Sequence, residues 1–548
     1  MASIISKTVS GHTYYYLREM ARVGGKPKMV SERYLGKAAD IEAAVAGASA
    51  TPDRSRHLAF GDLAAVWGIL GRLGVADIVD DVVGPRRADA AASVGTYMAL
   101  AVANRVVAPC SKLAFSQWWA GTAGDRLVKV PASALDHRRF WEAMDALDEA
   151  DLVEIERRVV ARMVEVFDLD VSGLVLDMTN FATYIDSGND RAPIAQRGHA
   201  KQKRTDLRLV GLGLVVSVDG GVPLVSHAYA GNRPDVTQFG DVVAKLVERF
   251  GPLADAGGEL TLVYDAGQDS AANQELIEDS PLHFVGSLPP SDHPGLLAMA
   301  KRSYRGVDAE RFPGLTAFEG RASALGRDRR VVVTHSENLH DKQAAGFAQT
   351  LAKAARQLSD LAARLARGNT RRPRDRVEAE IASILRPRWL TRVVTTSLRG
   401  DTPTELRLTW STSTAALAAL QDELFGKRIL FTDHDHWPIT QLVAGYRSQS
   451  HVEADFRQMK DPRVVSFSPM HHWTDHKIRV HVFHCVLALT VARLMQRETE
   501  RAGIAMRVRE LLSTLAGIQE TVLLYQGERG RPRARRMLTE MDPTQTRL

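Results

Sequence analysis

Three acidic residues drawn from distant parts of the chain carry the strongest chemical signal in this sequence. Asp177 and Asp265 each follow a strand-like apolar run, and Glu453 lies in a segment that becomes basic at its end. Divalent ions such as Mg²⁺ prefer hard oxygen ligands, and two ions about 3.5–4 Å apart can activate a nucleophile and stabilise a leaving oxygen. The trio therefore predicts a two-metal phosphoryl-transfer site.

The position of the two aspartates strengthens this prediction. The strand-like runs 171–176 and 261–264 each end directly before an aspartate. An aspartate at the end of a strand is held at the edge of a sheet, where active sites of α/β folds commonly lie. A single aspartate there is more often a turn former or a helix cap, whereas two of them favour a function. Asp269 is interpreted as the N-cap of the following helix.

The segment 446–460 predicts a helix with three chemical groups on one face. Tyr446, Glu453 and Lys460 are seven residues apart, and seven residues make about two helical turns. Glu453 would bind metal, Lys460 would contact a phosphate, and Tyr446 would steer a nucleic-acid backbone. The spacing alone is equally compatible with a solvated, charged helix face. An adjacent apolar stripe would dock the helix on a sheet: Val452, Phe456 and Met459.

Length and composition bound the architecture. The 548 residues exceed what one hydrophobic core supports, which predicts three or four domains or subdomains. The net charge of +6 favours a polyanionic partner without identifying one. The two cysteines, Cys110 and Cys485, support neither a disulfide framework nor a zinc ribbon and suit a reducing compartment. No apolar run approaches about 18 residues, so we expect no membrane segment and a cytoplasmic location.

The pattern along the chain predicts an α/β protein whose catalytic core is interrupted by an insertion domain. Three strands, a helix and a strand that ends at Asp265 form an order that suits an RNase H-like core. Six segments are expected: a small β-rich piece with a hairpin (1–50), a helical, DNA-binding region (51–165), the first part of the core (166–290), an insertion with a long helix and a β-rich part (291–425), the second part of the core with the Glu453 helix (426–500), and a C-terminal helix with a basic tail and a disordered polar end (501–548).

Some patterns leave two interpretations open or exclude a function. The apolar stripe of the helix at 341–365 is either a dimer interface or core packing. His481 and His484 lie on an apolar helix and are interpreted as packed side chains rather than metal ligands. The glycines of the run 211–213 lack the third glycine of a dinucleotide fingerprint, and the chain has no P-loop, so ATP use is not expected.

The segment 446–460 resembles the signature helix of DDE transposases from bacterial insertion sequences, which carries tyrosine, arginine, glutamate and lysine at fixed spacing. Tyr446, Glu453 and Lys460 match this pattern, and Gln449 stands at the arginine position. Two further stretches resemble the same group: the basic run 197–208, which begins Arg-Gly-His, and the turn Gly-Asn-Arg-Pro-Asp at 231–235.

The resemblance implies an RNase H-like catalytic domain, with Asp177, Asp265 and Glu453 as the catalytic residues and the ligands of two Mg²⁺ ions, for which Mn²⁺ would substitute. It implies metal-dependent cleavage at the terminal repeats of an insertion sequence and strand transfer into target DNA by a synaptic homodimer in a bacterial, nucleoid-associated setting. The DNA contacts expected from these stretches are Tyr446, Arg447, Arg457, Lys460, Lys201, Lys203 and Arg204.

Three alternatives remain open on the sequence. The chain could be an inactive or domesticated DNA-binding derivative of such an element, against which the intact acidic trio argues. It could be an RNase H-type nuclease that cuts without strand transfer. A carboxylate-pair glycosidase is the third alternative, and metal dependence separates it from the other two.

Overall fold

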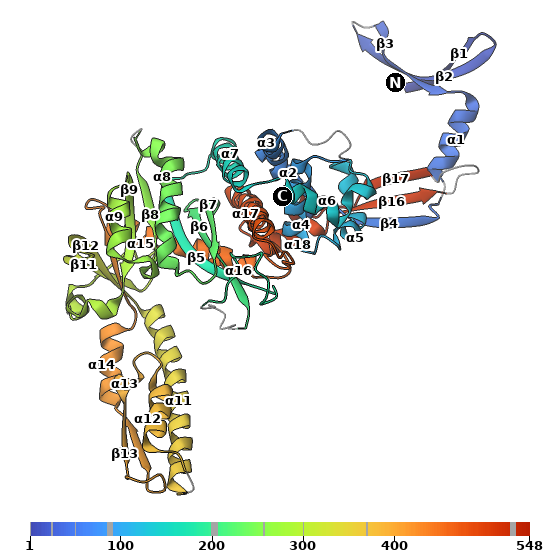
Figure 1. Ribbon diagram of the computed structural model, residues 1–548. Coiled ribbons are helices and arrows are strands. Elements are labelled where there is room, and N and C mark those ends of the chain that lie inside the picture. The colour runs from blue at the N-terminus through green and yellow to red at the C-terminus, as the bar shows by residue number, and fades with distance from the viewer. Residues whose placement is uncertain are drawn as a thin grey trace. The chain divides into compact units, whose positions relative to one another are not determined.

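A computed structural model describes residues 2–23, 26–49, 51–84, 91–198, 206–255, 258–299, 301–368, 371–525 and 533–548 (Figure 1). The chain is a mixed α/β protein with one large mixed sheet and many helices. It divides into two compact units. The first comprises Met1–Ala64, Gln117–Lys129 and Leu512–Leu548, and the second comprises Ala65–Ser116 and Val130–Leu511. The second unit contains all three residues of the acidic trio.

The first unit contains two small antiparallel sheets. The predicted N-terminal hairpin is confirmed, because β2 pairs with β3, and Tyr16 and Tyr34 pack with their ring centroids 5.3 Å apart. One sheet has the strand order β1-β2-β3 and the other β17-β16-β4. The elements are β1 (Ala2–Val9), β2 (His12–Val23), β3 (Lys26–Gly36), α1 (Ala38–Ser49), β4 (Arg54–Ala59), β16 (Gln519–Tyr525), β17 (Arg533–Leu538) and α19 (Pro543–Arg547).

The C-terminal part of this unit differs from the prediction. The sequence indicated helix up to residue 525 and a disordered end, whereas β16 and β17 are strands and α19 is a short helix. The reason is a pairing that spans almost the whole chain, since β16 pairs with β4 in the register Val522 to Arg56. Val522 packs in a small core with Leu58 and Ala123. Pairing over such a separation leaves no local signal.

The second unit is built on a nine-stranded sheet with the order β10-β11-β12-β15-β9-β8-β5-β6-β7. Only the neighbours β9, β8 and β5 run parallel, and the other pairs are antiparallel. The predicted strands and hairpin of the core are confirmed. The strands are β5 (Gly173–Thr183), β6 (Arg208–Ser217), β7 (Pro223–Ala230), β8 (Leu260–Val263), β9 (Leu282–Leu288), β10 (Arg305–Gly306), β11 (Leu315–Ala324), β12 (Arg327–Ser336) and β15 (Lys427–Thr432).

Part of the predicted insertion belongs to this sheet. β10, β11 and β12 lie within 291–425 but extend the sheet beside β15, so the segment outside the sheet begins after Ser336. Residues 390–393, predicted as strand, form the helical turn α13. The segment outside the sheet contains α11 (Glu337–Ala366), α12 (Arg374–Leu385), α13 (Leu390–Val393), β13 (Val394–Arg399), β14 (Arg407–Thr412) and α14 (Thr414–Leu424).

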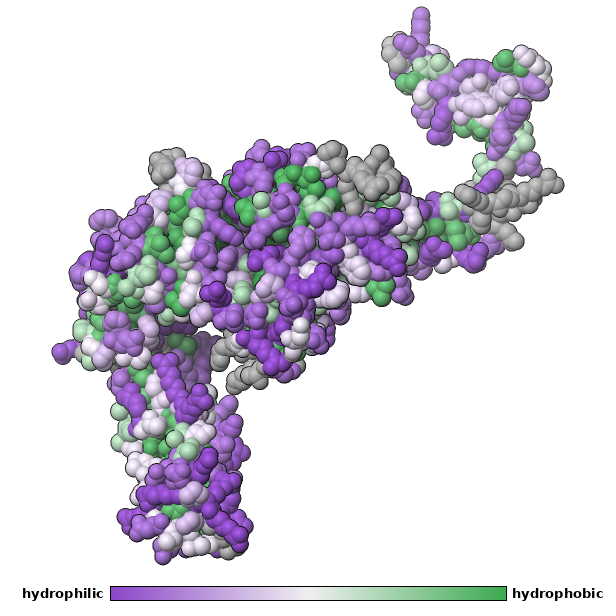
Figure 2. Space-filling view, viewed as in Figure 1, coloured by the Kyte–Doolittle hydropathy of each residue, from purple (hydrophilic) through white to green (hydrophobic). Residues whose placement is uncertain are grey.

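The apolar stripe of α11 packs inside this segment. Phe347, Ala354, Leu358, Leu361 and Leu365 are buried, and α11 contacts α12 and β14. In Figure 2 hydrophilic residues predominate on the visible surface of the segment that contains α11 to α14. Of the two interpretations of this stripe, the structure therefore supports core packing.

Helices cover the central sheet on both faces. Successive side chains of a strand point to opposite faces. Met178 of β5 lies beside Val242 of α8 (Phe239–Asp255), whereas Thr179 accepts a hydrogen bond from Lys460 at the end of α16 (Gln449–Met459). Thus α8 and α16 lie on opposite faces, and Asp177 shares the face of α16.

The remaining helices include one that is long and apolar enough to cross a membrane. This helix is α17 (Asp475–Arg501), and 89% of its most apolar window is buried inside the protein, against α4, α6, α7 and β7. Such burial is typical of a core helix. The other helices are α2 (Gly61–Leu73), α3 (Val75–Val83), α4 (Val94–Val107), α5 (Phe115–Ala120), α6 (His137–Asp145), α7 (Glu149–Phe167), α9 (Ala271–Glu278), α10 (Pro294–Leu297), α15 (Ile439–Arg447) and α18 (Val508–Ala516).

Candidate active site

The two aspartates of the trio come from neighbouring parallel strands: Asp177 lies within β5, and Asp265 follows β8, which ends at Val263. β5 pairs with β8 in a register that ends at Val175 opposite Val263, so each aspartate comes two residues after the last paired position. Neighbouring strands are about 4.8 Å apart, and side chains at matching positions point to the same face. Asp177 lies within β5, which continues to Thr183, and not at its end as predicted. The strand is longer because β6 pairs along its whole length.

A chain of hydrogen bonds supports Asp265 from one side. The backbone N–H of Ala266 donates to Asp265 Oδ1 at 2.6 Å, and the Ser287 hydroxyl donates to the same oxygen at 3.2 Å. The Tyr446 hydroxyl donates to Ser287 Oγ at 3.0 Å and accepts from Arg428 Nη1 at 3.1 Å. Burial, and to a lesser extent the Asp265 carboxylate, raises the pKa of Tyr446 above its usual range. Tyr446 therefore stays protonated and can donate.

Ser287 was not identified from the sequence, although its position follows from the strand register. β8 pairs with β9 with Val263 opposite Val285, and the same offset brings Asp265 opposite Ser287. Asp265, just beyond β8, and Ser287 of β9 are thus within hydrogen-bonding distance of each other. A serine near the end of an apolar strand carries no signal until the neighbouring strand is known.

The segment of the predicted signature helix forms two helices that meet at Ser448. The Ser448 N–H donates to the carbonyls of both Ala444 and Gly445, at 3.2 and 3.1 Å, which tightens the turn between α15 and α16. Ser448 has φ −63° and ψ −14°, so the backbone stays close to helical. Tyr446 is in the last turn of α15, Glu453 is in α16, and Lys460 caps α16.

Packing brings Glu453 and Lys460 to the face of β5 that carries Asp177. Lys460 Nζ donates to Thr179 Oγ1 at 2.8 Å and lies 5.5 Å from the ring centroid of Phe181. Thr179 and Phe181 alternate with the residues on the other face, as Asp177 does. α16 packs against β5 and β6 through its buried residues. The trio, separated by up to 276 positions in the sequence, therefore shares one face of the sheet.

The carboxylates of the trio offer hard oxygen donors. Glu453 is exposed, and within the described residues its carboxylate forms no hydrogen bond or ion pair. Asp265 is exposed and uses only Oδ1 in the hydrogen bonds above. The described residues contain two groups of potential ligands whose atoms all lie within 4.8 Å, and the trio is not one of them. Carboxylate oxygens are ligands that Mg²⁺ prefers, so the donor chemistry of the trio fits this ion. The carboxylate oxygens of the trio are farther apart than the binding of one shared ion requires.

A cavity of about 280 Å³ adjoins Glu453 and presents groups that suit an anion. Arg428, Tyr446, Arg447, Gln449 and Glu453 are among its lining residues. Burial and the neighbouring Arg428 lower the pKa of Arg447. Within the described residues neither arginine has a carboxylate partner, and the buried Gln449 Nε2 has no hydrogen-bond partner. These donors would match the oxygens of a phosphate.

The structure distinguishes Arg447 and Arg457, the two arginines near Gln449 that are expected to contact DNA. Arg447 lies over the Phe312 ring, 4.6 Å from its centroid, and lines the cavity. Arg457 lies on the exposed side of α16, where its Nε donates to the Glu453 carbonyl at 3.4 Å. Arg447, and not Arg457, therefore lines the same cavity as Gln449. Lys201, Lys203 and Arg204, predicted as DNA contacts, lie outside the described residues.

Two other stretches singled out in the sequence lie against each other. A Cβ on Gly198 would come within 2.1 Å of the Gly231 carbonyl oxygen, and a Cβ on Gly231 within 2.0 Å of the Leu209 carbonyl. Only glycine permits this approach of backbone to backbone. The following Asp235 accepts a hydrogen bond from the Tyr229 hydroxyl at 2.7 Å. Gly198, near the start of the basic run, therefore packs directly against the glycine-asparagine turn.

Comparison with known proteins gives no family. No family model matches the chain, and no curated protein matches it. Among solved structures, the piggyBac transposase synaptic complex with hairpin DNA is similar, with a TM-score of 0.37 and 10% sequence identity over 83% of this chain and 80% of that chain. A TM-score of this size does not establish a shared fold.

Asp269 does not cap the following helix as predicted. The N-cap of α9 is Ser270, whose hydroxyl accepts from the Asn273 N–H. Both carboxylate oxygens of Asp269 are buried and have no hydrogen-bond partner within the described residues. Burial, and then the charge of Asp265, raises the pKa of Asp269 to about 8. This carboxyl therefore keeps its proton at neutral pH.

Replacing Asp269 with asparagine will flatten the pH dependence of stability. In the unfolded chain Asp269 ionises above about pH 4, whereas the native state holds the proton up to about pH 8. The native state binds more protons, so its stability falls as the pH rises across this window. The Asp269→Asn variant has no carboxyl to ionise and therefore lacks this loss. Between pH 5 and pH 8 its free energy of unfolding will fall by about 1–3 kcal/mol less than that of the native chain. Urea unfolding at both pH values measures it, with the exposed Asp279→Asn as control. Parallel curves for native chain and variant would contradict the assignment.

Proposed function

We propose that this chain is a DDE transposase of a bacterial insertion sequence. It cleaves DNA at the ends of the element in a metal-dependent reaction and joins the ends to target DNA. One arrangement carries this proposal. Asp177 within β5 and Asp265 just beyond β8 each come two residues after the last paired position of these parallel strands, and Glu453 and Lys460 come to β5 through α16, which packs on that strand.

The strand order supports an RNase H-like core within the central sheet. β5, β6 and β7 follow one another as antiparallel neighbours, and α8 then leads to β8, which lies parallel to β5 on its other side. β9 adds a further parallel strand. This is the order of three strands, a helix and an aspartate-bearing strand that the sequence predicts. The segment between β12 and β15 is the insertion that separates Asp265 from Glu453.

The trio would hold two Mg²⁺ ions, or Mn²⁺ in their place, which when bound supply Lewis-acid activation of the attacking hydroxyl and stabilisation of the leaving oxygen. The protein's own part is positioning. Ala266 N–H and Ser287 hold the Asp265 carboxylate in one orientation. Lys460, Arg447 and Tyr446 would contact the phosphates of the DNA strand, and Arg457 lies farther out on the exposed side of α16. Because two element ends must be joined together, we propose a synaptic homodimer, without ATP, acting in the nucleoid region of the cytoplasm.

The decisive experiment is an assay with the purified chain and DNA that carries the ends of its own element. With Mg²⁺ or Mn²⁺ we expect nicks at the element ends and products joined to a target plasmid, and with EDTA neither product. Cleavage without joined products would identify a nuclease instead. Binding without either product, at any metal concentration, would identify a DNA-binding derivative.

Removing the Ser287 hydroxyl will slow cleavage by about tenfold. Ser287→Ala breaks the link between Tyr446 and Asp265, and the loss of one hydrogen bond to a carboxylate, about 1.5 kcal/mol, corresponds to that factor when it is felt in the transition state. Single-turnover cleavage at saturating DNA measures the rate, and DNA affinity is expected to change less than twofold. Ser291→Ala, which removes an exposed hydroxyl, is the matched control. Equal cleavage rates for Ser287→Ala and Ser291→Ala would show that the Ser287 hydroxyl does not contribute to cleavage.

Lys460→Ala will weaken binding to the element ends and reduce its salt dependence by about one unit of slope. The side chain holds its ammonium group against Thr179 on the face that carries Asp177, where a DNA phosphate would approach. Fluorescence anisotropy across a salt series measures the slope. Lys460→Arg keeps the charge and should keep the slope. If Lys460→Ala also keeps it, Lys460 contacts no phosphate.

A further inference from the structure

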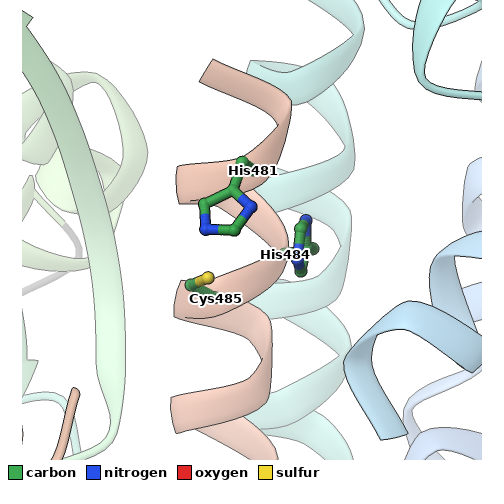
Figure 3. Close-up of side chains that lie close together, drawn as sticks. All are labelled: His481, His484 and Cys485. Carbon is green, nitrogen blue, oxygen red and sulfur yellow. The ribbon is translucent and has the colours of Figure 1, made fainter. Parts of the chain in front are cut away.

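Three side chains of the core helix α17 form a second cluster of potential metal ligands. His481, His484 and Cys485 project from neighbouring turns (Figure 3). One ring nitrogen of each histidine and the cysteine Sγ all lie within 4.8 Å of one another. The three residues are 1–2% exposed. The two histidines were interpreted from the sequence as packed because they lie on an apolar helix, and the structure buries both of them.

The hydrogen bonds of the two imidazoles fix where their lone pairs lie. His481 Nε2 is 2.8 Å from the Phe467 carbonyl oxygen, and His484 Nδ1 is 3.1 Å from the Val480 carbonyl oxygen. A carbonyl oxygen only accepts, so these two nitrogens carry the protons. The lone pairs are therefore on His481 Nδ1 and His484 Nε2.

Both lone-pair nitrogens are buried without a hydrogen-bond partner among the described residues. Buried polar atoms are nearly always satisfied, so two adjacent orphan acceptors require a ligand or another explanation. Metal-bound histidines typically donate their other N–H to a backbone carbonyl or carboxylate, which sets the ring orientation. Both imidazoles already have this arrangement through Phe467 and Val480.

We propose that His481 Nδ1, His484 Nε2 and Cys485 Sγ bind one Zn²⁺ ion. Two imidazole nitrogens and a thiolate form a donor set that Zn²⁺ accepts, at helical positions i, i+3 and i+4. On binding, the Cys485 thiol releases its proton to solvent, the thiolate forms the Zn–S bond, and no atom changes oxidation state. The ring centroid of a further imidazole, that of His472, is 5.3 Å from that of His481. The ion would link successive turns of α17, independently of the transposase proposal.

Two cationic side chains beside the cluster influence the binding. Arg105 Nη1 donates to the carbonyls of Ser466 and Ser468, at 3.3 and 2.9 Å. Burial, and then Arg105, lowers the pKa of Lys112 to about 7. Burial raises the pKa of the Cys485 thiol to about 11, although Arg105 and Lys112 lower it. The thiol would therefore ionise only when a metal ion takes the place of its proton.

Elemental analysis of the full chain tests the proposal. The protein is incubated with ZnSO₄, dialysed extensively and analysed by mass spectrometry for metal. We expect about one Zn²⁺ per chain for the native protein and for Cys110→Ser, and at least a fivefold lower content for Cys485→Ser and His484→Gln. A native protein without zinc, or a Cys485→Ser variant with the full content, overturns the proposal.

Cobalt substitution provides a readout that does not depend on the variants folding. The native chain loaded with Co²⁺ is expected to show a thiolate-to-cobalt charge-transfer band in the near ultraviolet. Zn²⁺ added afterwards should remove the band. Absence of the band in native, folded protein would show that Cys485 binds no metal, whatever the variants do. Neither outcome bears on Asp177, Asp265 and Glu453, so DNA cleavage can fail or succeed separately.

Discussion

Replacing any one of Asp177, Asp265 and Glu453 by its amide will lower the rate of DNA cleavage by at least about a thousandfold. Each amide keeps the size of the side chain but removes the negative charge that would balance a divalent ion. In the Asp265→Asn variant the side-chain amide oxygen could still accept from the Ala266 N–H, so the loop keeps its local hydrogen bond. The loss would therefore come from metal binding and not from a disturbed fold.

Single-turnover cleavage of end-containing DNA at saturating Mg²⁺ measures this effect, and circular dichroism monitors the fold. Glu248→Gln is the matched control, because Glu248 is exposed on α8, on the opposite face of the sheet from Asp177. It should cut at the native rate. A trio variant that cuts and joins DNA as well as this control would show that the catalytic residues lie elsewhere.

Arg493→Met will destabilise the second unit by about 3–5 kcal/mol. Arg493 of α17 pairs with Asp455 of α16, with 2.5 Å between Nε and Oδ1, and the Asp455 side chain is fully buried. Burial nevertheless raises the pKa of Asp455 to about 7, because the loss of hydration outweighs the attraction of Arg493. Without Arg493, the carboxyl remains buried with no partner charge, on the same helix as Glu453.

The pH dependence of this variant has a definite sign. Below about pH 4 Asp455 is protonated in both the folded and the unfolded chain, so the variant loses little from the missing partner. As the pH rises towards 7 and beyond, the unfolded chain ionises freely while the native state must hold the proton or bury the charge, and stability falls. Urea unfolding at pH 5 and pH 8 should show the larger deficit at pH 8.

The double variant Asp455→Leu/Arg493→Met separates the charge effect from lost packing. Replacing both partners of a buried pair by apolar groups of similar size is often neutral, so most of the deficit should be recovered. Arg457→Met, on the exposed side of α16, is expected to cost less than about 1 kcal/mol. A double variant as unstable as Arg493→Met alone would attribute the loss to packing.

Local patterns in the sequence were sufficient for many individual elements. The helix expected near 270–278 is α9, the hairpin around Gly220 joins β6 and β7, and the stripe from Phe347 to Leu365 runs along α11. Each of these depends on side-chain periodicity or turn residues within about 30 positions. The predicted ends of strands were less accurate where pairing with a neighbouring strand makes a strand longer, as for β5, which continues beyond Asp177.

Pairings between distant segments were decided by the tertiary structure alone. β12 joins the central sheet through β15, about a hundred residues later, and β16 pairs with β4 near the other end of the chain. Ser287 and Arg428 were likewise recognised as parts of the candidate site only from the structure. Strand register brings Ser287 beside Asp265, and helix packing brings Tyr446 beside Arg428. The protonation state of Asp269 depends on its burial, which cannot be predicted from the local sequence pattern.

The sequence by itself determined the chemistry available to this protein: two aspartates after apolar strands, a glutamate on an amphipathic segment, and a lysine seven residues beyond it. These are properties of residue type and local spacing. Only the tertiary structure decided that Asp177, Asp265 and Glu453 face the same side of one sheet, and that His481 and His484 of α17 are buried with one ring nitrogen each lacking a hydrogen-bond partner among the described residues. Proximity between distant segments arises from strand register and core packing, because these minimise the free energy of the whole chain and not of any one segment.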